Sequence, residues 1–266
     1  MPRIKLLIEY DGTDFIGWQT QPNGRSVQAA IERALEELFG TATRIHGAGR
    51  TDTGVHASGQ VAHFDAETLL SPATIVNALN ARLPEDVVVK RADVADDAFH
   101  ARFSASSRRY TYRIFTGRSA LLRRNHWLFY ARLNLQEMQE AVNFLTGTHD
   151  FTTLSKYSDD SKHGFCHVFH ARLEVEGSLY RFDITANRFL TGMVRSIVGG
   201  LAQVGRGKMT AQEFDARLQA RNRTHAPQLA PPHGLTLEEV KYDKDEYEFI
   251  RGILNALRME RERSVV

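Results

Sequence analysis

Cysteine is nearly absent from this sequence of 266 residues, since Cys166 is the single one and no disulfide can form within the chain. A chain without disulfides is typical of a reducing compartment. Long apolar runs are missing too, because no stretch approaches the roughly 20 apolar residues that span a bilayer. The N-terminal residues Arg3–Glu9 read as a strand and carry no signal-peptide core. We therefore expect a soluble, cytoplasmic protein that does not enter a membrane.

Acidic residues are missing from one long stretch of the chain. No Asp or Glu occurs between Ala98 and Gln136, although the formal net charge of the whole chain is only +2. The arginines of this stretch are Arg102, Arg108, Arg109, Arg113, Arg118, Arg123, Arg124 and Arg132. A one-sided basic surface of this kind can bind the phosphates of a nucleic acid. The alternative is that these arginines lie on exposed strand faces without a partner.

Helix and strand patterns alternate in the first hundred residues. Ser26 and Gly40 are suited to begin and end a helix, and apolar residues recur between them at helical spacing. Ser71 and Pro72 indicate a second helix that runs to about Arg82. Strands are predicted at Ile4–Tyr10, Thr43–His46, Gln60–Asp65 and Asp86–Arg91. The resulting order, β-α-β-β-α-β, is the split βαβ pattern.

The second half of the chain repeats this order loosely. Strands are predicted at Arg109–Phe115, Trp127–Tyr130, His167–Val175, Tyr180–Thr185 and Leu235–Tyr242. Helices are predicted after the cap Asn134 as far as Gly147, then at Leu190–Val204, Ala211–Ala220 and after Asp245. We therefore predict an α+β protein of two split-βαβ-like halves, residues 1–105 and 106–266. Their mainly antiparallel sheets are expected to join across a central cleft.

The loop Gly47–His56 is the densest chemical signal, because three glycines surround Arg50, Thr51 and Asp52. Glycine lets a backbone bend sharply and approach a ligand closely. A dinucleotide-binding fingerprint would need glycine where Asp52 stands, and the Gly-Lys-Ser/Thr of a P-loop is absent. The residues alone leave two interpretations open. The loop is either a functional site or a tight turn with a structural Arg–Asp pair.

The segment His163–His170 contains a cysteine and three histidines, which invites a zinc interpretation. Alternation along a strand would place Cys166 and His170 on one face and His167 on the other. That arrangement splits the set, so we predict no metal site. His56, at the end of the glycine-rich loop, is expected to support the shape of the loop rather than to bind a ligand.

Several blocks of the sequence together resemble the TruA family of tRNA pseudouridine synthases. The loop residues Gly49–Ala57 are similar to the signature of that family, and the other blocks follow in the same order. These blocks are Tyr10–Gln19, Ser26–Gln28, Phe99–Ser104, Arg108–Tyr112, Phe189–Arg195 and His233–Leu237. The resemblance is weakest from Ser155 to His170. It implies the pseudouridine synthase fold.

The resemblance implies a reaction at uridines 38, 39 and 40 of the tRNA anticodon stem-loop. Uracil is detached from ribose at N1, turned within the site and rejoined through C5. Breaking the bond builds positive charge at the anomeric carbon, which a carboxylate can stabilise or attack. The resemblance assigns this role to Asp52 and implies no cofactor. Whether Asp52 attacks the sugar, attacks the base or removes a sugar proton stays open.

The resemblance also assigns roles to residues outside the catalytic carboxylate. Tyr110 would stack on the extruded uracil and could also act in proton transfer, and Arg195 would pair with the catalytic carboxylate and orient it. Arg50 would hold the base out of its stack. Further substrate contacts are expected from Thr51, Arg102, Arg108 and Arg109. From the pattern alone, Tyr110 would be a core aromatic residue, and the arginines would be solvated.

The partners implied by the resemblance are tRNA and a second copy of the chain, because members of the family are homodimers. Two rival functions remain open. The first is an RNA-binding protein that has the fold but not the catalysis. The second is a glycosidase acting on a nucleoside, which usually needs a second carboxylate as general acid. The signature loop offers only one carboxylate.

Overall fold

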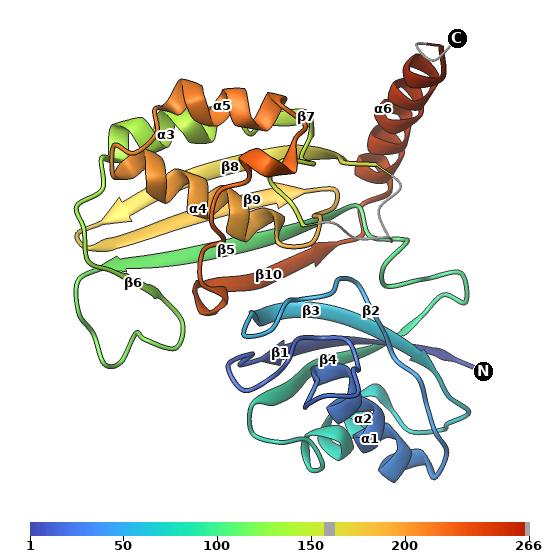
Figure 1. Cartoon of the computed structure of the whole chain (residues 1–266). Helices are drawn as coiled ribbons and strands as arrows, with labels where there is room; N and C mark the ends of the chain where they lie inside the picture. The colour runs from blue at the N-terminus through green and yellow to red at the C-terminus, as the bar shows by residue number, and fades with distance from the viewer. Residues whose placement is uncertain (157–162, 264–266) are drawn as a thin grey trace. The chain divides into compact units, whose positions relative to one another are not determined.

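The computed structural model describes residues 1–156 and 163–263, apart from the side chains of residues 257–263. The chain divides into two compact units (Figure 1). Unit 1 consists of Met1–Ala105 together with two later segments, Ala120–Trp127 and Pro231–Val240. Unit 2 consists of Ser106–Ser119, Leu128–Ala230 and the residues from Lys241 onward. Unit 1 thus combines the stretch that ends at Ala105 with two segments from the second half of the chain.

Unit 1 contains a sheet in the order β4-β1-β3-β10. Strand β1 (Arg3–Tyr10) pairs antiparallel with β3 (His56–Asp65) and with β4 (Val87–Ala95). On its other edge, β3 pairs with the short β2 (His46–Gly47) and, in parallel, with β10 (Leu235–Lys241). The order of elements expected for the first half is confirmed, and β10 is an added strand from far along the chain.

Two helices cover one face of the unit 1 sheet (Figure 1). Helix α1 (Val27–Phe39) is capped by the Ser26 side chain and ends at Gly40 in the left-handed conformation, as its sequence predicts. Helix α2 (Pro72–Asn80) begins after the cap Ser71. The side chains between helices and sheet are fully buried: Leu6, Ile8, Val27, Ile31, Leu35, Ala62 and Phe64. Each large apolar side chain buried in this way stabilises the fold by about 1.5–3 kcal/mol.

Unit 2 contains an antiparallel sheet in the order β5-β9-β8-β7, with β6 (Trp127–Phe129) paired to β5. The strands are β5 (Ser107–Thr116), β7 (Gly147–Asp150), β8 (Phe165–Glu176) and β9 (Leu179–Ala186). Helices α3 (Leu135–Asn143), α4 (Met193–Gly205) and α5 (Ala211–Gln219) pack together over one face of it (Figure 1). Both units are therefore α+β, with mainly antiparallel sheets.

The remaining elements are short or terminal. Two 3₁₀ turns, η1 (Arg223–His225) and η2 (Pro232–Gly234), precede β10. Helix α6 (Lys244–Arg263) follows it. Neither α6 nor any other helix in the described parts of the chain is long and apolar enough to cross a membrane.

Three expectations about secondary structure are wrong in detail. Only His46 of the strand expected at Thr43–His46 belongs to β2, which is two residues long. Strand β3 begins at His56, so the end of the glycine-rich loop is already part of the sheet. Gly147 does not end a helix but begins β7, because pairing with β8 outweighs the weak strand propensity of Gly-Thr-His-Asp.

The expected alternation in β8 is also wrong. Cys166 is fully buried, but His170 is exposed, although four residues separate them. The register of β8 against β9 shifts between Val168 and His170, so one extra residue reverses the faces beyond it. Within residues 1–156 and 163–263, no group of three His, Cys, Asp or Glu side chains could hold a metal ion. Part of the segment Ser155–His170, residues 157–162, lies outside the described residues.

Candidate active site

The loop Gly47–His56 connects β2 to β3 and is held by backbone hydrogen bonds from residues that are distant in sequence. The Trp18 amide donates to the Thr51 carbonyl at 3.1 Å, and the Gly54 amide donates to the Phe15 carbonyl at 3.2 Å. Gly54 has φ +76°, a left-handed conformation that favours glycine. These long-range bonds fix the path of a loop that has no regular structure of its own.

Two glycines outside the loop allow the chain to approach it closely. A methyl group at Gly12 would overlap the Val55 carbonyl, and one at Gly17 would lie 2.6 Å from the Thr51 carbonyl oxygen. Gly17 also has φ +110°, which strains any other residue. The block Tyr10–Gln19 therefore packs directly against the backbone of the loop.

A buried polar contact joins the loop to β1. The Tyr10 hydroxyl and the Thr51 hydroxyl lie 2.8 Å apart, and both side chains are buried. Burial raises the pKa of Tyr10 well above its usual value, so its hydroxyl stays protonated. The Gln60 amide nitrogen donates to the Gly49 carbonyl at 2.8 Å from the adjacent strand. The hydroxyl of Thr51 thus serves the internal structure of the loop.

Asp52 follows this buried residue and lies at the turn of the loop. Its carbonyl accepts a hydrogen bond from the Val55 amide at 3.1 Å, which closes the turn. Asp52 is partly exposed to solvent, and Arg50, two residues earlier, is exposed. The anchored loop therefore carries an acidic and a basic residue that are both at least partly exposed.

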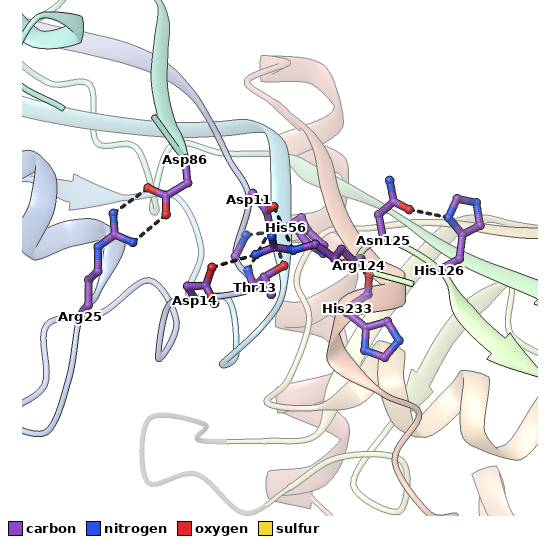
Figure 2. Close-up of polar contacts among 11 residues, drawn as sticks. Asp11, Thr13, Asp14, Arg25, His56, Asp86, Arg124, Asn125, His126 and His233 are labelled. Atoms are coloured by element: carbon purple, nitrogen blue, oxygen red, sulfur yellow. Dashed lines mark hydrogen bonds and ion pairs between the residues drawn. The ribbon is translucent and has the colours of Figure 1, made fainter. Parts of the chain in front are cut away.

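His56 closes the loop with both of its ring nitrogens. Nδ1 accepts a hydrogen bond from the Gly12 amide at 3.1 Å, while Nε2 lies 2.9 Å from the Arg124 carbonyl and 3.1 Å from the His233 carbonyl (Figure 2). The His56 side chain is buried. The expectation that it supports the loop is confirmed, but its partners come from three separate segments of unit 1.

An ion pair lies beside His56, as Figure 2 shows. The Arg124 guanidinium is 2.8 Å from Asp14 and 4.0 Å from Asp11. Partial burial acts to raise the pKa of Asp11, but the hydrogen bonds from the Thr13 hydroxyl and amide, together with the neighbouring His56 and Arg124, lower this pKa. Arg124 is therefore paired within unit 1, although the sequence suggested it as part of a basic surface.

Tyr110 lies in the middle of β5 in unit 2, opposite Ile184 of β9. Its ring is buried and meets the Phe189 ring edge-on, with centroids 5.0 Å apart at 85°. Such an edge-to-face pair is worth about 1 kcal/mol beyond its buried area. The ring is thus held in a fixed orientation by a residue that precedes α4.

Arg195 lies in the first turn of α4, also in unit 2. Its Nε donates to the Ala230 carbonyl at 2.8 Å, and the Ala230 amide donates back to the Arg195 carbonyl at 3.0 Å. Burial raises the pKa of Tyr112, two residues beyond Tyr110, well above its usual value, and Arg195 acts in the opposite direction. Phe189 therefore packs against Tyr110, and the charge of Arg195 influences Tyr112. These two tyrosines lie on the same face of β5.

Gly199 makes the approach to α4 possible. A methyl group there would overlap the Gln228 carbonyl. This glycine lets the chain that carries Ala230 lie directly against the helix. No local sequence signal indicated that Ala230 would be the acceptor for Arg195.

The arginines expected to contact RNA have different environments. Arg102 is exposed, whereas Arg108 and Arg109 are half-buried on β5. Arg108 donates to the Asn187 carbonyl at 2.8 Å. Arg108 therefore also has a structural bond within unit 2.

The predicted site residues divide between the two units. Unit 1 contains Arg50, Thr51, Asp52 and Arg102, and unit 2 contains Arg108, Arg109, Tyr110 and Arg195. Sequence reasoning missed the supporting residues Tyr10, Trp18 and Ala230. The first two lie in a block that resembles the family, but nothing in their spacing shows what they contact.

Comparison with known proteins gives a consistent result. The family model described as tRNA pseudouridine synthase matches residues 6–104 and 141–243. The tRNA pseudouridine synthase A of Bacteroides thetaiotaomicron is 40% identical over 262 residues, which are 97% of this chain and 97% of the relative. That of Afipia carboxidovorans is 44% identical over 245 residues, 91% of this chain and 100% of the relative. That of Thermosipho melanesiensis is 42% identical over 245 residues, with the same two coverages.

Among solved structures, the chain has a slight likeness to "Structure of H/ACA RNP bound to a substrate RNA containing 2'-deoxyuridine". The TM-score is 0.33 and the identity 10%, over 75% of this chain and 53% of that one. This likeness carries no argument about the site.

Proposed function

The chain belongs to the tRNA pseudouridine synthase family, and we propose that it converts uridines 38, 39 and 40 of the tRNA anticodon stem-loop to pseudouridine, with Asp52 as the catalytic carboxylate. The observation that carries the assignment to Asp52 is the anchored loop. Its backbone is fixed by Trp18 and Phe15, while Asp52 itself is partly exposed to solvent. A catalytic group needs this combination, because a displacement of about 1 Å can cost a factor of about 100 in rate.

The reaction conserves the atoms of the substrate. The bond between N1 and C1′ breaks, a bond between C5 and C1′ forms, C5 loses a proton and N1 gains one. The step consumes no oxidant, reductant or phosphate donor. Positive charge develops at C1′ as the first bond breaks, and a nearby carboxylate stabilises or attacks that centre. Asp52 supplies this carboxylate in the proposal.

Tyr110 and Arg195 have proposed roles towards the same uridine. Tyr110 would stack on the extruded uracil, which suits a ring whose orientation is fixed by Phe189. Arg195 would be the cationic partner of the reacting carboxylate, which suits a guanidinium whose Nε is held by the Ala230 carbonyl. A close cation favours the ionised form of a carboxylate.

The other proposed substrate contacts concern extrusion and the RNA backbone. Taking a base out of its stack costs a few kcal/mol. Arg50 is exposed next to the catalytic loop and would hold the extruded position. Arg102, Arg108 and Arg109 would contact phosphates, and Thr51 would contribute through the shape of the loop. Affinity for tRNA should then fall steeply with added salt.

A second copy of the chain is a further proposed partner, on family resemblance. Light scattering of the purified protein across a concentration series would test it directly. A single species with the mass of one chain at all concentrations would contradict the proposal.

The deciding experiment is pseudouridine mapping of tRNA treated with the wild type and with Asp52→Asn. This substitution keeps the size of the side chain and removes its charge. We expect the rate to fall by about three orders of magnitude or more while tRNA affinity is retained. Asp93→Asn is the matched control, because Asp93 is an accessible carboxylate of unit 1 that pairs with Arg91 on β4.

Each outcome of this mapping tests a separate part of the proposal. Turnover by Asp52→Asn would exclude Asp52 as the catalytic carboxylate. Pseudouridine at other tRNA positions would exclude the assignment to 38, 39 and 40. Tight tRNA binding without any pseudouridine from the wild type would indicate an RNA-binding relative without catalysis.

A further inference from the structure

The side chain of His56 is buried at the end of the Asp52 loop and contacts backbone groups through both of its ring nitrogens. It is 8% exposed, and both ring nitrogens lie within hydrogen-bond distance of backbone groups. It is the first residue of β3 and comes four positions after Asp52. The Val55 amide, just before it, bonds the Asp52 carbonyl and so links the ring to the turn.

The partners of His56 indicate which ring nitrogen donates and which accepts. The Gly12 amide can only donate, so Nδ1 accepts and carries no hydrogen. Nε2 must then carry the hydrogen, and it donates towards the carbonyls of Arg124 and His233. Nδ1 is also 3.1 Å from an Asp11 carboxylate oxygen, a contact that would be an ion pair only in the protonated ring.

The three partners come from three distant parts of the sequence. Gly12 follows β1, Arg124 belongs to the segment Ala120–Trp127, and His233 lies in η2 before β10. Arg124 is itself held by Asp14 (Figure 2). Gly54 of the loop lies close to the Pro232 ring, since a methyl group on Gly54 would be only 3.0 Å from that ring. The ring of His56 is therefore the point at which these segments meet the loop of Asp52.

We propose that His56 is a positioning residue for the Asp52 carboxylate, acting through the hydrogen bonds from its Nε2 to the carbonyls of Arg124 and His233. The inference rests on the proposed function. His56 takes no part in proton transfer, because both of its nitrogens are occupied by the backbone. Its effect is to hold the end of the loop against two segments that arrive from the second half of the sequence.

Three substitutions separate the two sides of the ring. His56→Gln keeps a donor near the position of Nε2, whereas His56→Asn keeps an acceptor near the position of Nδ1. His56→Phe keeps an aromatic ring but loses both the donor and the acceptor. The matched control is His225→Ala, since His225 is an exposed histidine in η1 of unit 2.

The measurements are the single-turnover rate of pseudouridine formation, the dissociation constant for tRNA and the melting temperature. We expect His56→Phe to lower the single-turnover rate by about 100-fold and to change the dissociation constant less than about twofold. His56→Gln should stay within about fivefold of the wild type, and His56→Asn should fall well below it. The rates are measured at a temperature at which every variant is folded. Should His56→Phe not fold, the comparison of Gln with Asn decides alone.

Two results would overturn the inference. The first is a rate equal to that of the wild type in every folded variant, which would leave His56 with a purely stabilising role. The second is a faster rate for His56→Asn than for His56→Gln, which would move the function to the bond from Gly12. A wild type that forms no pseudouridine in tRNA would overturn the proposed function, and this inference with it.

Discussion

The two units hold their candidate residues by different means. In unit 1, Asp52 lies on an irregular loop whose backbone is fixed by the Phe15 carbonyl and the Trp18 amide, both from the segment after β1. In unit 2, Tyr110 and Arg195 lie on a strand and a helix whose backbone bonds are regular. A loop has no repeating bonds to define it, so its geometry depends on close approaches between distant segments. A strand or helix needs only its side chains to be fixed.

This difference predicts which substitutions should disturb the candidate residues of each unit. Substitutions that block a close approach should deform the loop of unit 1 together with its carboxylate. In unit 2, comparable substitutions should displace the acceptor that holds a side chain and leave the strand ladder intact. Four experiments can confirm or break this distinction.

The largest expected effect comes from Gly12→Ala in unit 1. The added methyl group would overlap the Val55 carbonyl, which lies in the loop itself. We expect a loss of about 3 kcal/mol in the free energy of unfolding, and a loss of activity greater than the unfolding explains. Urea titration measures the first and pseudouridine formation the second. The stability control is Gly49→Ala in the same loop, where a methyl group meets nothing within 4 Å.

Gly199→Ala should have the next largest effect and tests unit 2. Alanine normally stabilises the interior of a helix by up to about 1 kcal/mol relative to glycine. Here its methyl group would overlap the Gln228 carbonyl, so we expect a loss of about 2 kcal/mol instead. Gly252→Ala in α6, where the space is open, should not destabilise the protein. Equal signs for the two substitutions in urea titrations would refute the close approach to α4.

Acid should weaken unit 1 before unit 2. Burial, then the neighbouring His100 and Arg3, lowers the pKa of His63 from its ordinary 6.5 to about 4. Above pH 6.5 the imidazole is neutral in both states, and between pH 6.5 and 4 only the unfolded chain takes up the proton, so stability falls as the pH falls. A pKa shift of this size corresponds to a loss of about 3 kcal/mol in the free energy of unfolding, and solvent screening reduces the expected loss to about 1–2 kcal/mol.

Hydrogen exchange at pH 7 and pH 5 measures this difference. The pKa values of His100 and His233 in unit 1 are also lowered, mainly by burial, and so is that of His167 in unit 2. Amides of β1 and β3 should therefore lose more protection than those of β5 and β9. His63→Asn retains an acceptor for the Ala101 amide, removes the titration and should reduce the loss in unit 1. A uniform loss across both units would contradict the prediction.

The smallest effect is expected from Tyr10→Phe. It removes the hydroxyl that lies 2.8 Å from the Thr51 hydroxyl under the loop. A lost buried hydrogen bond of this kind costs about 1 kcal/mol. Tyr130→Phe is the control, because Tyr130 is 72% exposed. Identical melting temperatures for the two variants would show that the contact with Thr51 does not support the loop.

Elements with local signals could be predicted from the sequence, and elements without them could not. Helix α1 has its cap at Ser26 and its stop at Gly40, and both are confirmed. Strand β7 has no such signal, because its four residues form a strand only by pairing with β8. The bulge between Val168 and His170 is equally hidden, since the one extra residue that reverses the faces shows only in the pairing with β9.

The candidate site shows the same division. The positions of Asp52, Tyr110 and Arg195 in the sequence blocks were sufficient to nominate them, because each block resembles a known family. Their supports depend on contacts between distant residues. Nothing adjacent to Arg195 in the sequence indicates that the Ala230 carbonyl orients it.

By itself, the sequence determined the α+β class, most of the helices and strands and the candidate residues of the site, because periodicity, caps and motifs are local properties. Only the tertiary structure decided how the Asp52 loop is held. The partners of His56 lie 44, 68 and 177 residues away in the sequence. Contacts over such separations depend on the packing of the whole unit, which no local pattern encodes.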